Sequence, residues 1–97
     1  MRYTRKFIEA RFAMAMDAIG APHGETYTKQ ADGFYKANVG VHSIDHNSVY
    51  GGYCIEKIVN EGGGSSRPFG DRHNAAGFIA MLDGILGAAR YLKGDAR

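Results

Sequence analysis

The chain has 97 residues and a mass of 10.5 kDa, so we expect residues 1–97 to form a single compact domain. Its composition of 44% hydrophobic and 23% charged residues is ordinary for a globular protein and excludes a disordered tail or a coiled-coil rod. The net charge of +2 is too small to indicate nucleic-acid binding by itself, and the single cysteine excludes an internal disulfide, which fits a reducing cytosol.

The N-terminal segment has the hydrophobic spacing of an amphipathic helix. Gly20 suits the left-handed position that ends a helix, and Pro22 prevents the helix from resuming. We therefore predict a helix from Tyr3 to Ile19. Its apolar stripe consists of Phe7, Ile8, Phe12, Ala15, Met16 and Ile19.

The middle third changes to the pattern of β-strands. A strand with one bulge is predicted from Phe34 to Ile44, followed by a loop from Asp45 to Gly52 and a second strand from Tyr53 to Val59. Two strands joined in this way favour an antiparallel hairpin. Thr26–Thr28 is a candidate third strand, and Ala31–Gly33 is a turn signal.

The last third is a long loop followed by a second helix. Asn60–His73 contains Pro68 and several glycines, which exclude regular structure, and Asn74 is a plausible N-cap. Gly94 is placed to end the helix. The predicted apolar stripe consists of Phe78, Ile79, Leu82, Ile85, Leu86, Ala89 and Leu92.

The order of elements predicts an α+β fold: an N-terminal helix, a two- to three-stranded antiparallel sheet and a C-terminal helix, with both helices on one sheet face. Such a sheet leaves Tyr53, Ile55 or Val59 exposed on its other face. Together with a row of small residues on the second helix, this favours a homodimer. That row consists of Gly77, Ala80, Gly84 and Ala88.

A glycine-rich loop between a strand and a helix is how many phosphate sites are built. Arg67 and Arg72 are placed to pair with an anion, although the spacing matches neither a Walker nor a dinucleotide-binding motif. The alternative is a surface loop whose Glu61 and Asp71 neutralise its own arginines. The candidate residues for a ligand or a partner are Asn60, Glu61, Gly62, Gly63, Gly64, Ser66, Arg67, Phe69, Arg72 and His73.

We predict no catalytic residue, no metal site and no cofactor. His42 and His46 lie roughly 13 Å apart in a strand, which is too far for both to bind one metal ion. The four histidines are therefore expected at the surface. Cys54 is expected to be a small buried residue rather than a nucleophile paired with His42. The basic residues of the first helix form a solvated face, and Ala75–Leu92 is too short and too polar for a membrane span.

Much of the chain resembles a group of small uncharacterised bacteriophage and prophage proteins. The resemblance is carried by Tyr50-Gly51-Gly52-Tyr53, by Asn60-Glu61-Gly62-Gly63-Gly64 and by Arg67-Pro68-Phe69-Gly70. It implies an accessory protein made in the cytoplasm of a bacterial host. Such proteins often act against host defences, as anti-CRISPR proteins do. The group has no assigned chemistry, so the resemblance brings no catalytic residue with it.

Two functions follow as expectations. The first is a non-enzymatic binding module that inhibits a host protein or nucleoprotein complex, using the basic N-terminal face and the aromatic residues Tyr3, Tyr27, Tyr35 and Phe69. The second is a sequestering protein that binds a nucleotide or other small phosphate ligand at the glycine-rich loop. In that case, the pocket is expected across a homodimer.

Overall fold

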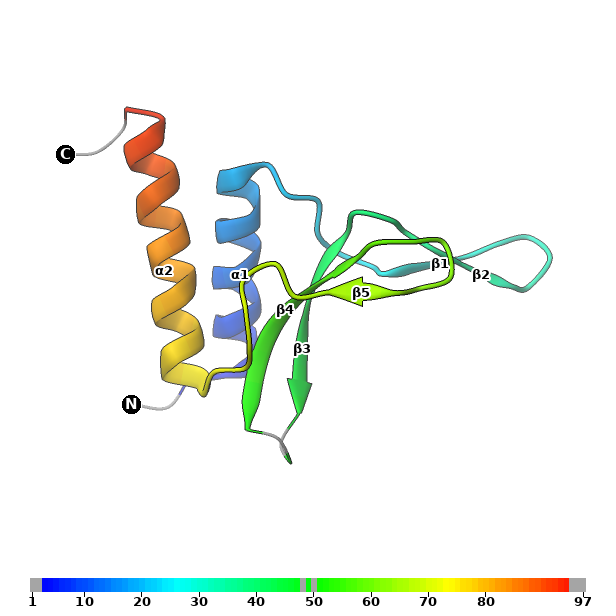
Figure 1. Ribbon diagram of the computed structural model, residues 1–97, viewed down its shortest axis with the longest axis horizontal. Coiled ribbons are helices and arrows are strands. Elements are labelled where there is room, and N and C mark those ends of the chain that lie inside the picture. Colours follow the sequence, from blue (N-terminus) through cyan, green and yellow to red (C-terminus); the bar gives the residue numbers. More distant parts are fainter. Residues whose placement is uncertain (1–2, 48, 50, 95–97) are drawn as a thin grey trace.

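The computed structural model describes residues 3–47, 49 and 51–94 and confirms the predicted α+β arrangement. The elements in chain order are α1 (Arg5–Ile19), β1 (Tyr27–Lys29), β2 (Tyr35–Ala37), β3 (His42–Asn47), β4 (Gly52–Ile58), β5 (Ser65–Ser66) and α2 (Ala75–Leu92). The two helices stand side by side next to the sheet β3–β4–β5 (Figure 1). β1 and β2 form a separate hairpin that extends away from the helices, which gives the molecule extents of 50 × 35 × 22 Å.

α1 follows the sequence prediction closely. It begins at Arg5 rather than Tyr3, because the Thr4 side chain is the N-cap and accepts a hydrogen bond from the Phe7 amide. Gly20 ends the helix in the left-handed conformation, with φ at +71°. Its buried face is narrower than the predicted stripe, since Phe7 and Ile19 are exposed, and it consists of Ile8, Phe12, Ala15 and Met16.

α2 is capped by Asn74 as predicted, because its Oδ1 accepts the amide of Gly77 at 2.8 Å. The two helices run parallel, joined by the Arg11–Asp83 ion pair and, nearer their C-terminal ends, by Lys93 Nζ, which donates to the carbonyl oxygen of Ala18. The prediction that Leu92 belongs to the core was wrong, since it is 82% exposed. The buried residues of α2 are Phe78, Ile79, Leu82, Leu86 and Ala89.

By length and composition, α2 could cross a membrane. Its 18 residues have a mean hydropathy of 1.3, so the expectation that this segment is too short and too polar was wrong on both measures. Core helices of water-soluble proteins meet the same two criteria. In this fold, the buried side of α2 packs in the cluster that includes Phe12 of α1 and Ile55 of β4.

The predicted hairpin is present, but its boundaries differ. β3 and β4 pair antiparallel from His42 opposite Lys57 to Asn47 opposite Gly52. The single bulged strand expected over Phe34–Ile44 was wrong, because a turn at Asn38–Val41 divides it into β2 and β3. The loop expected over Asp45–Gly52 also begins too early, since β3 continues to Asn47; residues 48 and 50 of that loop lie outside the described residues.

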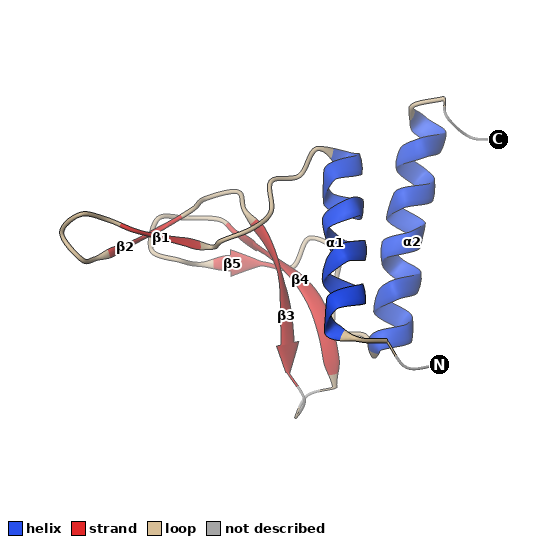
Figure 2. Cartoon of the chain, turned by 180° about the vertical axis from the view of Figure 1, so that it is seen from behind, coloured by secondary structure: helices blue, strands red, loops and turns tan. Residues whose placement is uncertain are grey.

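The candidate strand at Thr26–Thr28 corresponds to β1, which pairs with β2 and not with the main sheet. The turn predicted at Ala31–Gly33 joins them, with the Gly33 amide bonded to the carbonyl oxygen of Gln30. We call residues 27–37 the arm. Both views show the arm projecting from the side of the sheet that is remote from the helices (Figures 1 and 2).

The sheet is covered on both faces, contrary to expectation. Ile44 and Ile55 face the helices, and Ile55 is fully buried, while Tyr53 stacks on Phe78 with ring centroids 5.5 Å apart. Of the three residues expected to be exposed, Val59 is exposed. The other face is covered in part by side chains of residues 67–73, which we call the strap: Arg72 reaches Asp45, and Arg67 lies beside Glu56. Two of the three apolar residues whose exposure favoured a homodimer, Tyr53 and Ile55, are therefore not exposed.

Candidate functional site

The glycine-rich turn is closed on itself. The Gly63 amide donates to the carbonyl oxygen of Asn60 at 3.1 Å, and the Gly64 amide donates to Asn60 Oδ1 at 2.9 Å. The carbonyl oxygen of Gly64 accepts the Val59 amide at 2.8 Å. Two of the amides expected to cradle an anion are thus already used within the turn. The expected phosphate cradle has no support in this geometry.

Arg72 holds the strap against the sheet. Its guanidinium donates to the Asp45 carboxylate, to the carbonyl oxygen of Asp45 at 3.3 Å and to that of Gly52 at 3.1 Å. The hydrogen bond to Asp45 raises the pKa of Arg72, so the group stays charged. The expectation that Arg72 is available to pair with an anion finds no support, because its side chain is 15% exposed and three acceptors already hold it.

Arg67 is more open than Arg72. Its side chain is 43% exposed and lies 3.7 Å from the Glu56 carboxylate and 3.5 Å from that of Asp71. Together with Asn47, Asp71 and Arg72, it lines a polar hollow of about 540 Å³. Two guanidiniums and the three carboxylates of Asp45, Glu56 and Asp71 give this region an excess of negative charge. Such a balance does not attract phosphate.

The remaining candidate residues do not converge with these arginines on one site. Ser66 pairs with Lys57 in β5, and His73 exchanges two backbone hydrogen bonds of 2.8 Å with Tyr53. Phe69 packs against the core, and Glu61 is exposed. Five of the ten residues therefore lie in the turn Asn60–Gly64, at one end of β5, and four lie in the strap, at its other end, while Ser66 lies in β5 itself.

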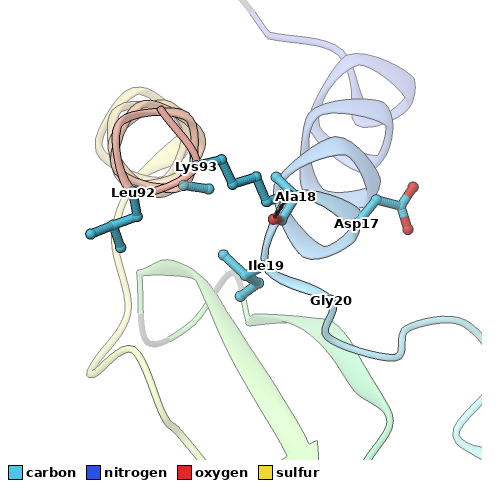
Figure 3. Close-up of a pocket in the computed structure, with 7 residues that line it drawn as sticks. Asp17, Ala18, Ile19, Gly20, Leu92 and Lys93 are labelled. Carbon is cyan, nitrogen blue, oxygen red and sulfur yellow. Dashed lines mark hydrogen bonds between the residues drawn. The ribbon is translucent and has the colours of Figure 1, made fainter. Parts of the chain in front are cut away.

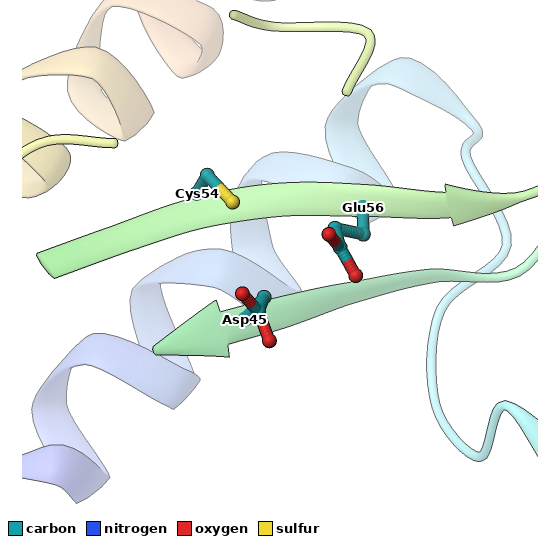
Figure 4. Close-up of side chains that lie close together, drawn as sticks. All are labelled: Asp45, Cys54 and Glu56. Carbon is teal, nitrogen blue, oxygen red and sulfur yellow. The ribbon is translucent and has the colours of Figure 1, made fainter. Parts of the chain in front are cut away.

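Cys54 lies near the guanidiniums of Arg72 and Arg67 and is fully buried, as predicted. Burial raises the pKa of its thiol, and the positive charges of Arg72 and Arg67 offset this only in part. Potential ligand atoms of Asp45, Cys54 and Glu56 lie within 4.8 Å of one another on the sheet face turned away from α1 (Figure 4). The guanidiniums of Arg67 and Arg72 already neutralise these carboxylates, so their salt bridges explain the cluster.

The histidines are dispersed over several elements. His42 was expected at the surface but is buried, and its Nδ1 lies 3.0 Å from the carbonyl oxygen of Pro22. It lies on the opposite face of the β3–β4 pair from Cys54, because the two positions alternate in the register. His23 pairs with Asp17 at 2.8 Å, and His46 stacks on Tyr53.

The basic face of α1 is largely neutralised. Arg5 pairs with Glu9 at 2.9 Å, and Arg11 pairs with Asp83 at 3.1 Å while lying over the Phe7 ring. Lys6 is exposed, and Arg2 lies outside the described residues. This face therefore offers little free positive charge.

An apolar hollow of about 470 Å³ lies where α1 and α2 both end, and no sequence pattern indicated it. Ile19 and Leu92 project toward it, and the Lys93 side chain crosses it to Ala18 (Figure 3). It is formed by the last turn of α1 and the C-terminal end of α2. An apolar hollow with so few polar groups does not by itself indicate a ligand.

Within the described chain, the arm is where highly exposed aromatic side chains lie near one another. Phe34 is 73% exposed and Tyr35 is 66% exposed, with Tyr27 on the paired strand. Of the four aromatic residues expected at a binding surface, Tyr27 and Tyr35 are exposed, whereas Tyr3 and Phe69 are half-buried against the core. Phe34 was not among the residues expected at a binding surface, although the turn signal Ala31–Gly33 directly precedes it.

Comparison of this chain with protein-family models, with curated proteins and with solved structures finds no match.

Proposed function

We propose that this protein is a non-enzymatic binding module that docks on a protein partner through its arm. The observation that carries the proposal is the exposure of Phe34 and Tyr35 on a hairpin that stands clear of the helices. Buried aromatic anchors contribute much of the binding energy in protein interfaces. A chain that leaves two such rings in water on its most projecting element is suited to place them in a pocket of another protein.

The tip of the arm is held in one shape before any partner binds. The Gln30 amide donates to the carbonyl oxygen of Phe34 at 2.8 Å, and the Phe34 amide donates to Asp32 Oδ1 at 3.0 Å. These bonds fix the backbone on which the Phe34 ring is mounted. Fixing a binding segment in advance lowers the conformational entropy that is lost on association.

The charge of the arm and its base favours a protein over a nucleic acid. Lys29 and Lys36 are balanced by Glu25 and Asp32, so this segment has no net charge. Nucleic-acid binding depends on neutralising several phosphates with an excess of Lys and Arg. Aromatic rings without that excess match the chemistry of a protein pocket.

The resemblance to bacteriophage accessory proteins supports a setting for this binding. In that setting, the partner is a host protein or nucleoprotein complex in the bacterial cytoplasm, and docking of the arm inhibits it. Sequestration of a nucleotide at the glycine-rich loop gains no support, because the Gly63 and Gly64 amides and Arg72 already have partners within the chain.

The test is affinity capture from bacterial lysate with three forms of the tagged chain: wild type, Phe34→Ser/Tyr35→Ser, and Tyr91→Ser. Tyr91 is as exposed as Phe34 but lies on α2, so it is the matched control. We expect a protein that is captured by wild type and by Tyr91→Ser and is lost with the arm variant. Circular dichroism checks that all three forms are folded.

Two results would refute the proposal. One is a captured protein that binds the arm variant as well as it binds wild type. The other is a nucleotide released from the purified chain and a rise in Tm on adding it back. A ligand at a hundred times its Kd stabilises by roughly 2.7 kcal/mol, which raises Tm by about 10–20 °C in a domain of this size.

A further inference from the structure

The glycine-rich turn lies against the arm. A methyl group placed on Gly63 would lie 2.5 Å from Tyr27 Oη and 3.4 Å from Tyr27 Cζ. Gly63 also has a φ of +87°, which side-chain-bearing residues rarely adopt. The Tyr27 hydroxyl therefore lies against the backbone of the turn at Gly63, where only glycine, which has no Cβ, leaves room for it.

The base of the arm is held by Asn38. Its amide donates to the carbonyl oxygen of Thr26, and its Nδ2 donates to that of Glu25. Its side chain also exchanges hydrogen bonds with Thr28 Oγ1 at 2.9 and 3.1 Å. Asn38 thus ties the two strands of the arm together. It does not fix the direction in which the arm leaves the sheet, because all of these partners belong to the arm or the residues beside it.

We infer that the turn Asn60–Gly64 is the seat that sets the direction of the arm, and that Gly63 is a positioning residue for docking. Within the arm, all residues except Ala37 are exposed, so little apolar packing competes with this contact. The turn itself is firm, because Asn60 closes it through both its carbonyl oxygen and its side chain. The importance of that direction for binding rests on the proposed function. The contact between Tyr27 and Gly63 is independent of the proposed function.

The direction of the arm is measurable without any partner. Spin labels at Ala31→Cys, in the turn of the arm, and Ala88→Cys, on the exposed side of α2, report the distance between arm and helix in a Cys54→Ala background. Both positions are exposed, so neither label displaces the core. We expect Gly63→Ala to shift or broaden the distance distribution, because the added methyl group displaces Tyr27.

Two variants separate the contact from backbone strain. Gly70→Ala is the matched control, since Gly70 has a φ of +90° and open space around the position of a Cβ; it should leave the distribution unchanged. Tyr27→Phe removes the nearest atom, so Gly63→Ala/Tyr27→Phe should restore the distribution. If Gly63→Ala does not fold, Tyr27→Ala removes the contact from the other side and should broaden the distribution.

The inference is overturned if Gly63→Ala leaves the distance unchanged, if Gly70→Ala shifts it equally, or if Tyr27→Phe fails to restore it. For a captured partner, Gly63→Ala should weaken binding and the double variant should recover it. A shifted arm with unchanged partner binding would refute the docking role of the arm while leaving the seat intact. The two proposals therefore fail on different measurements.

Discussion

Arg72 in the strap and Asp45 in β3, 27 residues apart in the chain, form an ion pair across the outer face of the β3–β4 hairpin. The same guanidinium binds the carbonyl oxygens of Asp45 and Gly52. The Arg72 side chain thereby lies over the second face of a sheet that has α1 and α2 on its first face. In a free loop Arg72 could bind an anion, but in this fold it holds the strap to the β3–β4 hairpin.

Replacing Arg72 should destabilise the chain. Arg72→Ala removes charge-assisted hydrogen bonds of a largely buried group, and we expect it to lower the free energy of unfolding by about 2 kcal/mol. Arg67→Ala is the control, since the ion pairs of Arg67 are longer and exposed, and it should cost less than about 1 kcal/mol. Urea denaturation of the three proteins compares them. Equal stability of the two variants would show that the strap is not held by Arg72.

The inward face of α1 should carry much of the stability. Phe12 is 6% exposed in the cluster with Leu82 of α2, so Phe12→Ala should cost about 3–5 kcal/mol through lost burial and the cavity left behind. Phe7, on the same helix, is 39% exposed, and Phe7→Ala should cost much less. Thermal unfolding monitored by circular dichroism measures both. A Phe12→Ala protein as stable as Phe7→Ala would mean that the helix face is wrongly assigned.

Cys54 should be unreactive in the native protein and should make stability depend on alkaline pH. Burial raises its pKa in the folded chain, so the folded state favours the neutral thiol. In the unfolded chain, the thiol ionises above about pH 8.5, and this favours unfolding. The stability that it contributes is therefore complete below that pH and is lost as the pH rises toward the folded pKa.

The measurement is the difference in unfolding free energy between wild type and Cys54→Ala from pH 7 to pH 10. Because the other groups that titrate in that range are common to both proteins, their contributions cancel in the difference. As the pH rises, the unfolding free energy of wild type should fall relative to that of Cys54→Ala. Alkylation of native wild type at pH 8 should be slow. Rapid alkylation would show that the strap opens readily over Cys54.

Self-association remains a prediction on one of the two grounds that the sequence offered, the row of small residues on α2. The covered sheet face no longer requires a partner, but Ala80, Gly84 and Ala88 are exposed along α2, and a methyl group on Gly84 would meet nothing within 4 Å. If a second copy packs on this row, light scattering at micromolar concentration should give about twice the 10.5 kDa mass of the chain. Gly84→Leu should weaken that dimer without lowering stability of the monomer. A monomer at this concentration would contradict the prediction.

The helices were predictable because their signals are local. Gly20 and Asn74 act on amides and carbonyls one turn away, and the spacing of apolar residues follows from 3.6 residues per turn. The hairpin β3–β4 was predictable for the same reason, since its strands are neighbours in the chain. The boundary between β2 and β3 was not, because the Asn38 side chain at this turn bonds to Glu25, which precedes β1, and to Thr28 in β1.

The sequence by itself therefore determined the class of fold, the helices and the burial of Cys54, whereas the tertiary structure alone decided what the loop residues do. Arg72 is a candidate anion ligand in any reading of the loop, and it becomes a structural group only when the strap brings it to Asp45. Phe34 reads as a strand residue until the arm leaves the sheet and exposes its ring. The role of Arg72 depends on a residue 27 positions away in the chain, and the exposure of Phe34 depends on how the arm lies relative to the sheet. Hydrophobic periodicity and capping residues report only on neighbours along the chain, so neither signal could predict these two outcomes.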